Sequence, residues 1–460
     1  MRMQRKRWLV PSVVVAMASG LCAAPTSGAA PGVESRAPSS AAATATTAAW
    51  GTTTSAPAGA RGQLFGTVAG APGDVWAVGG QNPGVSPTSL LTAPYAEHWN
   101  GTTWTATPVP LPPVYPAGSQ AAQLESVAST GASDVWAVGH VDNTSSLASR
   151  TLAYHWDGGA WSKTATPNPG GSSLGNHLFA VAARGSNDVV AVGDSGFPAR
   201  SLVLRWTGQA WTRVTTPNIG SLSAVALDAT TTWVASGNLV QALVGGVWTR
   251  LPALPAGSGT VYLSGLASSA TGLWAVGTDQ IPYFEGYLYR PYAVVWNGAQ
   301  WTKVSVPGSA GLSAVTAAGP DVLVTTGSSV VRLTPTSATV EVTPALGASY
   351  LEAVTADPTG QPWAVGWTGG GTTVVPAIIN APGINQGGIS VTAGYSGASV
   401  TWIGPQTGSG SASVFGTFEV GGLTVGTYTV VVAATGCSPG IATVVVAAGL
   451  VASVDAKVTC

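Results

Sequence analysis

The chain has 460 residues, of which 17 are Lys or Arg and 18 are Asp or Glu, so its formal net charge is −1 and only 8% of its residues are charged. An average soluble domain is about one-quarter charged, so long solvated helices held by Glu–Lys pairs are not expected. The lack of a basic excess also argues against nucleic acid or an anionic membrane as a partner, because both need a dense positive patch. The 18 tryptophans are the unusual feature.

The N-terminus has the pattern of a secretory signal. A basic segment at residues 2–7 precedes an apolar stretch at 9–24 that ends in small residues suited to cleavage, and a later cut after Ala30 is an alternative. The apolar stretch is short for a membrane span, so an uncleaved anchor is the less favoured interpretation. We therefore predict a signal peptide within residues 1–30, a low-complexity linker at 31–47, and a secreted or cell-surface, extracytoplasmic location.

One short phrase recurs seven times along the chain. DVWAVG begins at Asp74 and Asp134, the variant DVVAVG begins at Asp188, and weaker copies lie around Trp233, Leu273, Asp321 and Pro362. A short apolar segment such as LESVA precedes each copy. A phrase with two tryptophans, such as WNGTTW, follows most copies and leads into a Thr-rich segment. Each unit therefore contains four short β segments separated by turn residues.

Four strands per repeat, seven times over, predict an all-β protein with a seven-bladed β-propeller at residues 48–382. A β-solenoid is the alternative, but its repeats are shorter and more uniform. The seventh unit lacks its fourth segment, whereas the chain from Trp50 to Pro57 matches one in outline. We expect this N-terminal strand to complete the last blade and close the ring, which removes an open sheet edge.

These repeats resemble the kelch and galactose-oxidase-like propellers of exported bacterial proteins. The resemblance spans residues 48–382 and rests on scaffold motifs, so it implies a fold and no activity. A galactose-oxidase copper site would need a cysteine within the propeller, and residues 48–382 contain none.

The repeat accounts for most of the unusual composition. It places 15 of the 18 tryptophans at equivalent positions, where large flat rings fill the space between blades. Only Trp8, Trp367 and Trp402 fall outside this pattern. The recurrent aspartates are interpreted as turn residues, and the histidines beside the third-strand tryptophans as structural; these residues are Asp74, Asp134, Asp188, Asp321, His98 and His155.

A different vocabulary begins near residue 387 and predicts a small β-sandwich at 387–460. The phrase GTFEVGGLTVGTYTVVV, at 416–432, resembles carboxypeptidase regulatory-like domains of the prealbumin type. In that family the module is accessory and usually non-catalytic, and its fold belongs to a carbohydrate-binding-like group. If the last three segments run up, down and up, Cys437 and Cys460 end at one rim, so we predict a disulfide between them.

Candidate ligand-binding residues follow from propeller geometry. The loops between strands 2 and 3, and between strand 4 and the next blade, emerge on one face and vary widely in length here, as specificity loops do. The fifth repeat adds the insert IPYFEGYLYRPY, whose aromatic rings suit sugar rings or a peptide, although the insert can also simply pack on its own blade. The predicted binding residues are His140, Asp194, Asp279, Tyr283, Glu285, Tyr287 and Trp367.

Catalytic patterns are scarce. No metal-ligand cluster, HExxH motif or serine elbow is present, so we expect neither a cofactor nor a metal. The favoured function is a secreted, monomeric, non-catalytic protein that binds a glycan or a cell-surface protein. One alternative is a polysaccharide hydrolase or lyase that uses two facing carboxylates among Asp194, Asp279 and Glu285. The other is a structural component of the cell envelope.

Overall fold

The computed structural model of the protein describes residues 50–53, 61–82, 91–112, 115, 120–146, 148–284, 286–341, 343–344, 349–369, 374–381, 386–405, 407–413, 416–424, 426–446 and 451–460. The predicted signal peptide and the linker lie outside these residues. Within them, no helix is long and apolar enough to cross a membrane.

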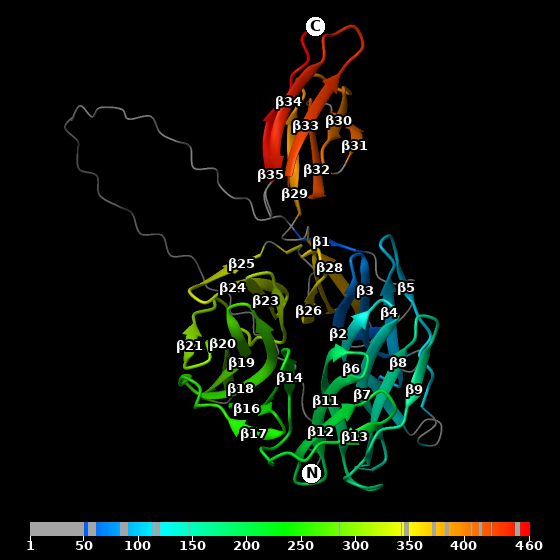
Figure 1. Cartoon of the computed structure of the whole chain (residues 1–460), viewed down its shortest axis with the longest axis vertical. Helices are drawn as coiled ribbons and strands as arrows, with labels where there is room; N and C mark the ends of the chain where they lie inside the picture. Colours follow the sequence, from blue (N-terminus) through cyan, green and yellow to red (C-terminus); the bar gives the residue numbers. More distant parts are fainter. Residues whose placement is uncertain are drawn as a thin grey trace, which may run out of the picture. The chain divides into compact units, whose positions relative to one another are not determined.

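The described chain is all-β, and its first part forms seven four-stranded antiparallel sheets, which are the blades (Figure 1). Strands follow one another in sequence order within blades 1 to 6. The strands of blades 1 to 4 are β2 (Gly62–Ala71), β3 (Asp74–Gln81), β4 (Ala93–Trp99), β5 (Trp104–Ala106), β6 (Gln120–Gly131), β7 (Asp134–Asn143), β8 (Ser149–Trp156), β9 (Trp161–Thr164), β10 (Asn176–Gly185), β11 (Asp188–Ser195), β12 (Arg200–Trp206), β13 (Trp211–Arg213), β14 (Ala224–Leu227), β15 (Thr231–Ser236), β16 (Leu239–Val244) and β17 (Val247–Arg250).

Blade 7 takes its outermost strand from the other end of the chain. The strands of blades 5 to 7 are β18 (Thr260–Ser269), β19 (Gly272–Tyr283), β20 (Gly286–Trp296), β21 (Trp301–Val304), β22 (Val315–Ala318), β23 (Asp321–Thr326), β24 (Ser329–Thr334), β25 (Ser337–Val340), β26 (Ser349–Ala356), β27 (Pro362–Thr368), β28 (Val375–Asn380) and β1 (Gly51–Thr52).

The ring is closed, as predicted. Strand β1 pairs antiparallel with β28, Gly51 opposite Asn380, and the adjoining Trp50 is buried. The first strand of every blade contacts the first strand of the next, and β26 of blade 7 contacts β2 of blade 1. The fold is therefore a seven-bladed β-propeller whose last blade is completed by the N-terminal strand.

Tight turns join the third and fourth strands of the blades. In blade 1 the Asn100 Oδ1 atom accepts hydrogen bonds from the backbone N–H groups of Thr102 and Thr103, both at 3.0 Å. Gly101, which follows Asn100 in this turn, has a φ of 94°, a conformation that only glycine adopts without strain. The side chain thus replaces a backbone acceptor and fixes the turn.

Tryptophan rings fill junctions between neighbouring blades. Trp76 of blade 1 is fully buried, and its ring centroid lies 4.7 Å from that of Trp156 and 5.0 Å from that of Trp161, both in blade 2. The Trp76 and Trp161 rings meet edge to face, the arrangement that the ring quadrupoles favour. The same triplet recurs at the junction of blades 2 and 3 and at that of blades 7 and 1, as Trp136 with Trp206 and Trp211, and Trp363 with Trp99 and Trp104.

The prediction that the recurrent aspartates are merely turn residues needs correction. Each lies beside a basic side chain of the third strand in its own blade: Asp134 Oδ1 is 2.8 Å from His155 Nε2, and Asp188 Oδ1 is 3.0 Å from Arg205 Nε. The other pairs are Asp74 with His98 and Asp321 with Arg332. The three blades that lack the aspartate also lack the basic residue. The residues at the two equivalent positions are Thr231 and Ala242 in blade 4, Gly272 and Val295 in blade 5, and Gln361 and Asn380 in blade 7.

His98 and His155 are structural, as predicted. Each imidazole stacks on the second-strand tryptophan of its own blade, with centroid separations of 4.3 Å for His98 on Trp76 and 4.4 Å for His155 on Trp136. One histidine therefore joins an aspartate to a tryptophan within each of these blades.

The C-terminal strands form two further sheets that enclose a separate apolar core, which includes Val400, Tyr428 and Val430. One sheet has the order β32-β29-β35, with β29 and β35 parallel; the other has the order β31-β30-β33-β34. The strands are β29 (Gln386–Thr392), β30 (Ser399–Ile403), β31 (Gly408–Ser411), β32 (Thr417–Thr424), β33 (Gly426–Ala433), β34 (Gly440–Val446) and β35 (Val451–Asp455).

The two C-terminal cysteines are joined, as predicted. Cys437 and Cys460 form a disulfide with a Cα–Cα distance of 4.2 Å. An isolated β-bridge between Ser438 and Thr459 lies beside it. The disulfide thus ties the β33–β34 turn to the end of the chain.

Closure of the ring makes a testable prediction about Trp50. Replacing it with alanine removes a buried ring from an apolar cluster that includes Leu323 of blade 6 and Ile379 of blade 7, and we expect the free energy of unfolding to fall by about 3–5 kcal/mol. Chemical denaturation of the mature protein measures this change. Thr52→Ala, at an exposed position of β1, is the control and should unfold as the wild type does. Equal stability of Trp50→Ala and wild type would contradict closure by this strand.

Candidate functional site

Three groups of predicted residues lie on the side of the propeller where strands 2 and 3 are joined. The first is at the junction of blades 2 and 3, the second is the hairpin of blade 5, and the third is at the end of β27 in blade 7. The three groups differ in burial and in bonding.

A group of polar side chains, called the polar cluster below, connects blades 2 and 3. Its centre is His177, at the start of β10, directly opposite Asp194 of β11. The His177 Nδ1 atom lies 2.7 Å from Asp194 Oδ1, and the Nε2 atom lies 3.0 Å from Ser149 Oγ of blade 2. The cluster comprises Glu125, His140, Asp142, Ser149, His177, Asp194 and Ser221.

His140 occupies the inner part of the polar cluster. It is 8% exposed, and its ring centroid lies 4.9 Å from that of His177. Its Nδ1 atom is 3.8 Å from Glu125 Oε1 and its Nε2 atom is 3.7 Å from Asp142 Oδ2. Both separations are too long for hydrogen bonds.

The two histidines differ in charge. Burial lowers the pKa of His140, so its ring is neutral at pH 7. Burial also acts to lower the pKa of His177, but hydrogen bonds and charge interactions with Asp142 and Asp194 outweigh it and raise this pKa to about 9. For Asp142 the penalty of burial is likewise outweighed, by His177, His140 and Ser149, and its pKa falls to about 2.

This arrangement favours a structural role for the polar cluster over a catalytic one. Ser149, His177 and Asp194 stand in the order of a nucleophile, a base and its orienting acid. However, an imidazole with a pKa near 9 already carries its proton at neutral pH and cannot accept one from Ser149. Ser149 is also only 5% exposed. Among the described residues, no group of three or more His, Cys, Asp or Glu side chains is arranged to hold a metal ion.

The structure brings together His140 and Asp194 of the predicted residues but leaves Asp279 elsewhere. Asp279 of β19 is 4% exposed, and its carboxylate accepts hydrogen bonds from the backbone N–H groups of Ser258 and Gly259, at 2.6 and 2.8 Å. The carboxylate therefore fixes the chain just before β18. This use is internal to blade 5.

Trp367 was predicted to face a ligand, but it is only 7% exposed. Its ring lies 4.5 Å from that of Tyr350, its partner across β26 and β27, with an interplanar angle of 31°. Most of this tryptophan is therefore covered within blade 7, and Tyr350 is the more accessible of the two rings.

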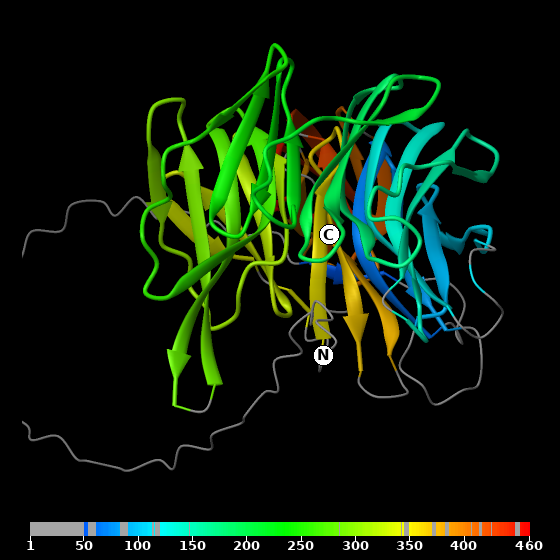
Figure 2. The same ribbon diagram turned by 90° about the horizontal axis from the view of Figure 1, so that it is seen from below.

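The predicted insert of blade 5 is a long hairpin. Strands β19 and β20 are paired along their whole length, from Leu273 opposite Trp296 to Tyr283 opposite Gly286. Strand β18 pairs with β19 only as far as Gln280. Figure 2 shows this hairpin extending past the other strands of its sheet. Tyr283 and Tyr287 are 56% and 48% exposed. Glu285 lies outside the described residues.

Phe284, at the tip of the hairpin, belongs to the predicted insert but not to the predicted binding residues. It is 94% exposed, has a φ of 34°, and its ring packs edge to face on Tyr283 at 4.9 Å. A phenylalanine in this region of φ is strained by about 1 kcal/mol or more. Strain and exposed aromatic surface thus coincide at one point of the molecule.

His177 was also missed by the sequence interpretation. The repeat contained a signal for it, because His177 stands immediately before the apolar segment that starts at Leu178. In blades 2 and 7 the residue at this position pairs with His140 and with Trp367, and in blade 3 it pairs with Asp194. Nothing in the sequence shows that Asp142, near the end of β7, lies beside His177 of blade 3.

Comparisons with known proteins give likenesses of fold. No family model matches the chain, and no curated protein matches it in sequence. The solved structure of YCF48 bound to a D1 peptide is similar with 13% identity and a TM-score of 0.48, covering 72% of this chain and 96% of that one. The structure of virginiamycin B lyase from Staphylococcus aureus is similar with 14% identity and a TM-score of 0.47, covering 69% of this chain and 94% of that one. The structure of PorZ, a surface component of a secretion system of Porphyromonas gingivalis, is similar with 11% identity and a TM-score of 0.43, covering 83% of this chain and 58% of that one. These similarities assign no function to the chain.

The pKa of His177 makes stability depend on pH. Because the folded-state pKa is about 9 and the unfolded value is 6.5, the contribution of this group is fully present below pH 6.5 and is lost as the pH rises through 9. The full contribution of His177 to the free energy of unfolding is on the order of 3 kcal/mol. Urea unfolding at pH 7 and at pH 10 measures it.

The matched control for this measurement is His177→Asn, which lacks the titrating ring. Wild type should lose more stability between the two pH values than the variant does, because tyrosines and lysines titrate equally in both. The same loss in both proteins would show that His177 does not hold its proton in the folded state.

Proposed function

We propose that the chain is an exported, non-catalytic binding protein that presents the hairpin side of its propeller to a glycan or a protein at the cell surface. In this proposal residues 1–30 are a signal peptide, 31–47 a linker, 48–382 a propeller of the kelch or galactose-oxidase type, and 387–460 a carboxypeptidase regulatory-like sandwich. The mature protein is a monomer without a cofactor.

The exposed tip of the blade 5 hairpin carries this proposal. Tyr283, Phe284 and Tyr287 leave much of three aromatic rings in water, although burying apolar surface is worth about 25 cal/mol per Å². Aromatic side chains of this kind dominate binding energy at interfaces once a partner covers them. A hairpin that served only its own blade would gain stability by folding these rings against it.

The carboxylates give less support to a hydrolase or lyase. A glycosidase needs one carboxyl that gives up a proton and a second that faces it across the substrate. Asp194 is held by His177 and Ser221, and Asp279 is held by two backbone N–H groups. Both are therefore committed to bonds within the propeller, and the polysaccharide-acting enzyme stays the second candidate. A structural envelope component is the third.

Export is supported by two observations. The basic and apolar N-terminal segments have the order of a secretory signal. The Cys437–Cys460 disulfide suits an oxidising compartment, since such bonds are rare in the cytosol.

The hairpin is tested with a variant that carries Tyr283→Ala, Phe284→Ala and Tyr287→Ala. We expect binding to a glycan array, or to intact bacterial cells, to weaken at least about tenfold, because a few aromatic residues usually carry most of the binding energy. Phe197→Ala is the matched control, since Phe197 is an exposed aromatic residue of blade 3. Unchanged binding by the triple variant would contradict the proposal, and release of reducing sugar from a bound glycan would favour the enzyme instead.

A further inference from the structure

The sandwich carries a hollow of its own, separate from the propeller residues discussed above. Its volume is about 600 Å³, within the range of about 300–1,000 Å³ of small-molecule sites. Two short segments line it, one before β30 and one after β33. The lining residues are Tyr395, Gly397, Ser399, Ala433, Ala434 and Thr435.

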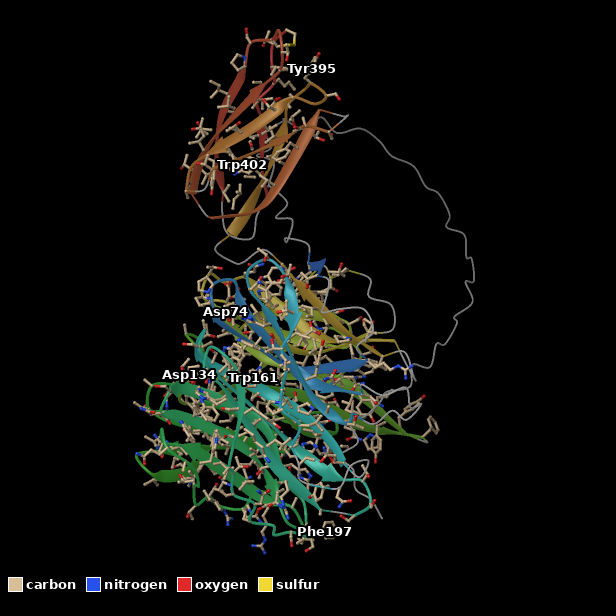
Figure 3. All side chains as sticks on the ribbon, turned by 90° about the vertical axis from the view of Figure 1, so that its right-hand side faces the viewer. Asp74, Asp134, Trp161, Phe197, Tyr395 and Trp402 are labelled. Atoms are coloured by element: carbon tan, nitrogen blue, oxygen red, sulfur yellow. A yellow bond between two sulfur atoms is a disulfide. The ribbon has the colours of Figure 1, made fainter. Side chains whose placement is uncertain are left out.

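The lining has one aromatic ring, three hydroxyl groups and no charge. Tyr395 is 47% exposed and lies at the end of the sandwich that carries the C-terminus (Figures 1 and 3). Ser399 and Thr435 supply hydroxyl groups, while glycine and alanine leave room in front of them. An exposed ring beside small residues and hydroxyl groups matches the surface of a sugar, which has an apolar C–H face and a rim of hydroxyl groups.

The hollow continues onto the outer face of the four-stranded sheet. Successive side chains of a strand point to opposite sides, and the inner side of these strands is buried. The outward residues, all within the described part of the chain, are uncharged; they are Ser399, Thr401, Ile403, Ser409, Ser411, Thr427, Thr429, Val431, Ala433, Ile441, Thr443 and Val445. Ile403, Ile441 and Val445 are 52%, 66% and 64% exposed.

This uncharged face selects among partners by its chemistry. It offers no group that pairs with a phosphate, a carboxylate or an ammonium, so a charged polymer gains nothing that replaces its hydration. Alternating hydroxyl and aliphatic side chains suit a ligand that is itself a regular mixture of hydroxyl groups and C–H surface. A neutral polysaccharide has this composition along its whole length.

Backbone bonds and the disulfide hold the walls of the hollow in place. The turn after β33 is closed by a hydrogen bond from Cys437 N to Ala434 O at 3.2 Å, and the next residue, Ser438, is bridged to Thr459. On the other wall, Gly397 N donates to Ala412 O at 3.1 Å. The Cys437–Cys460 bond therefore ties down the wall that carries Thr435, so that little order has to be gained on binding.

We propose that this hollow and the adjoining outer sheet face bind a neutral polysaccharide, with a sugar ring stacked on Tyr395 and its hydroxyl groups bonded to Ser399 and Thr435. The site is distinct from the hairpin of blade 5 and does not depend on it. The chain then has two binding surfaces, one in each of its two parts.

The test uses the full mature protein and neutral oligosaccharides of glucose, xylose and N-acetylglucosamine, with an oligogalacturonate as the charged comparison. We expect Tyr395→Ala to weaken binding of at least one neutral oligosaccharide by about tenfold or more, because ring stacking contributes beyond simple area burial. Tyr395→Phe keeps the ring and should bind within about threefold of wild type. The position is exposed, so melting temperatures should be unchanged.

Phe197→Ala is the matched control, because Phe197 is an exposed aromatic residue of blade 3. Binding lost with Tyr395→Ala and kept with Phe197→Ala supports the sandwich site. Tyr287→Ala, in the blade 5 hairpin, separates the two proposals: binding lost with Tyr287→Ala and kept with Tyr395→Ala would overturn the sandwich site while supporting the hairpin. Binding of oligogalacturonate alone, or of no oligosaccharide by the wild type, would also overturn it, as would capture of a protein at Ile441 without any bound sugar.

Discussion

Each blade of the propeller is a four-stranded sheet with an apolar side chain at the centre of its second strand, and that side chain has to be covered by the next blade. At three junctions it is a tryptophan packed against two tryptophans of the neighbour, as with Trp76 against Trp156 and Trp161. A single blade cannot bury both of its faces, so no blade is stable without its neighbours. The junction of Trp363 with blade 1 is therefore as necessary as any other. The N-terminal strand completes the last sheet, and the adjoining Trp50 belongs to the apolar cluster of blades 6 and 7.

The scarcity of charge follows from the same constraint. Both faces of every blade are buried against neighbours, which leaves mainly turns and outer strands for charged residues. Where a charge does sit at a junction it is paired, as Asp134 is with His155 and His177 is with Asp194. Removing one partner would leave the other charge partly buried and unpaired, which is far more costly than losing an exposed ion pair.

Two surfaces are exceptions to this burial, and each presents an uncovered aromatic ring from a turn or bend next to a strand. The hairpin of blade 5 holds Phe284 in water in a strained conformation, and the sandwich leaves Tyr395 beside an uncharged sheet face. The polar cluster is the opposite case, because His177 bonds to Asp194 and Ser149 within the fold. These polar residues lie at the junction of blades 2 and 3, whereas exposed aromatic residues mark the candidate binding surfaces.

The sequence alone determined the all-β propeller, its seven repeats, the closing strand at Trp50 and the Cys437–Cys460 bond, because each rests on a local period or on chain order. It also placed Tyr283 and Tyr287 in an insert, since an interruption of a repeat is visible in one dimension. Only the tertiary structure decided that Trp367 is covered, that Asp279 bonds its own blade, and that His177 joins Asp142 to Asp194 across a junction. These three outcomes depend on which side chains come into contact in space. Such contacts are set by the packing of strands and blades rather than by spacing along the chain.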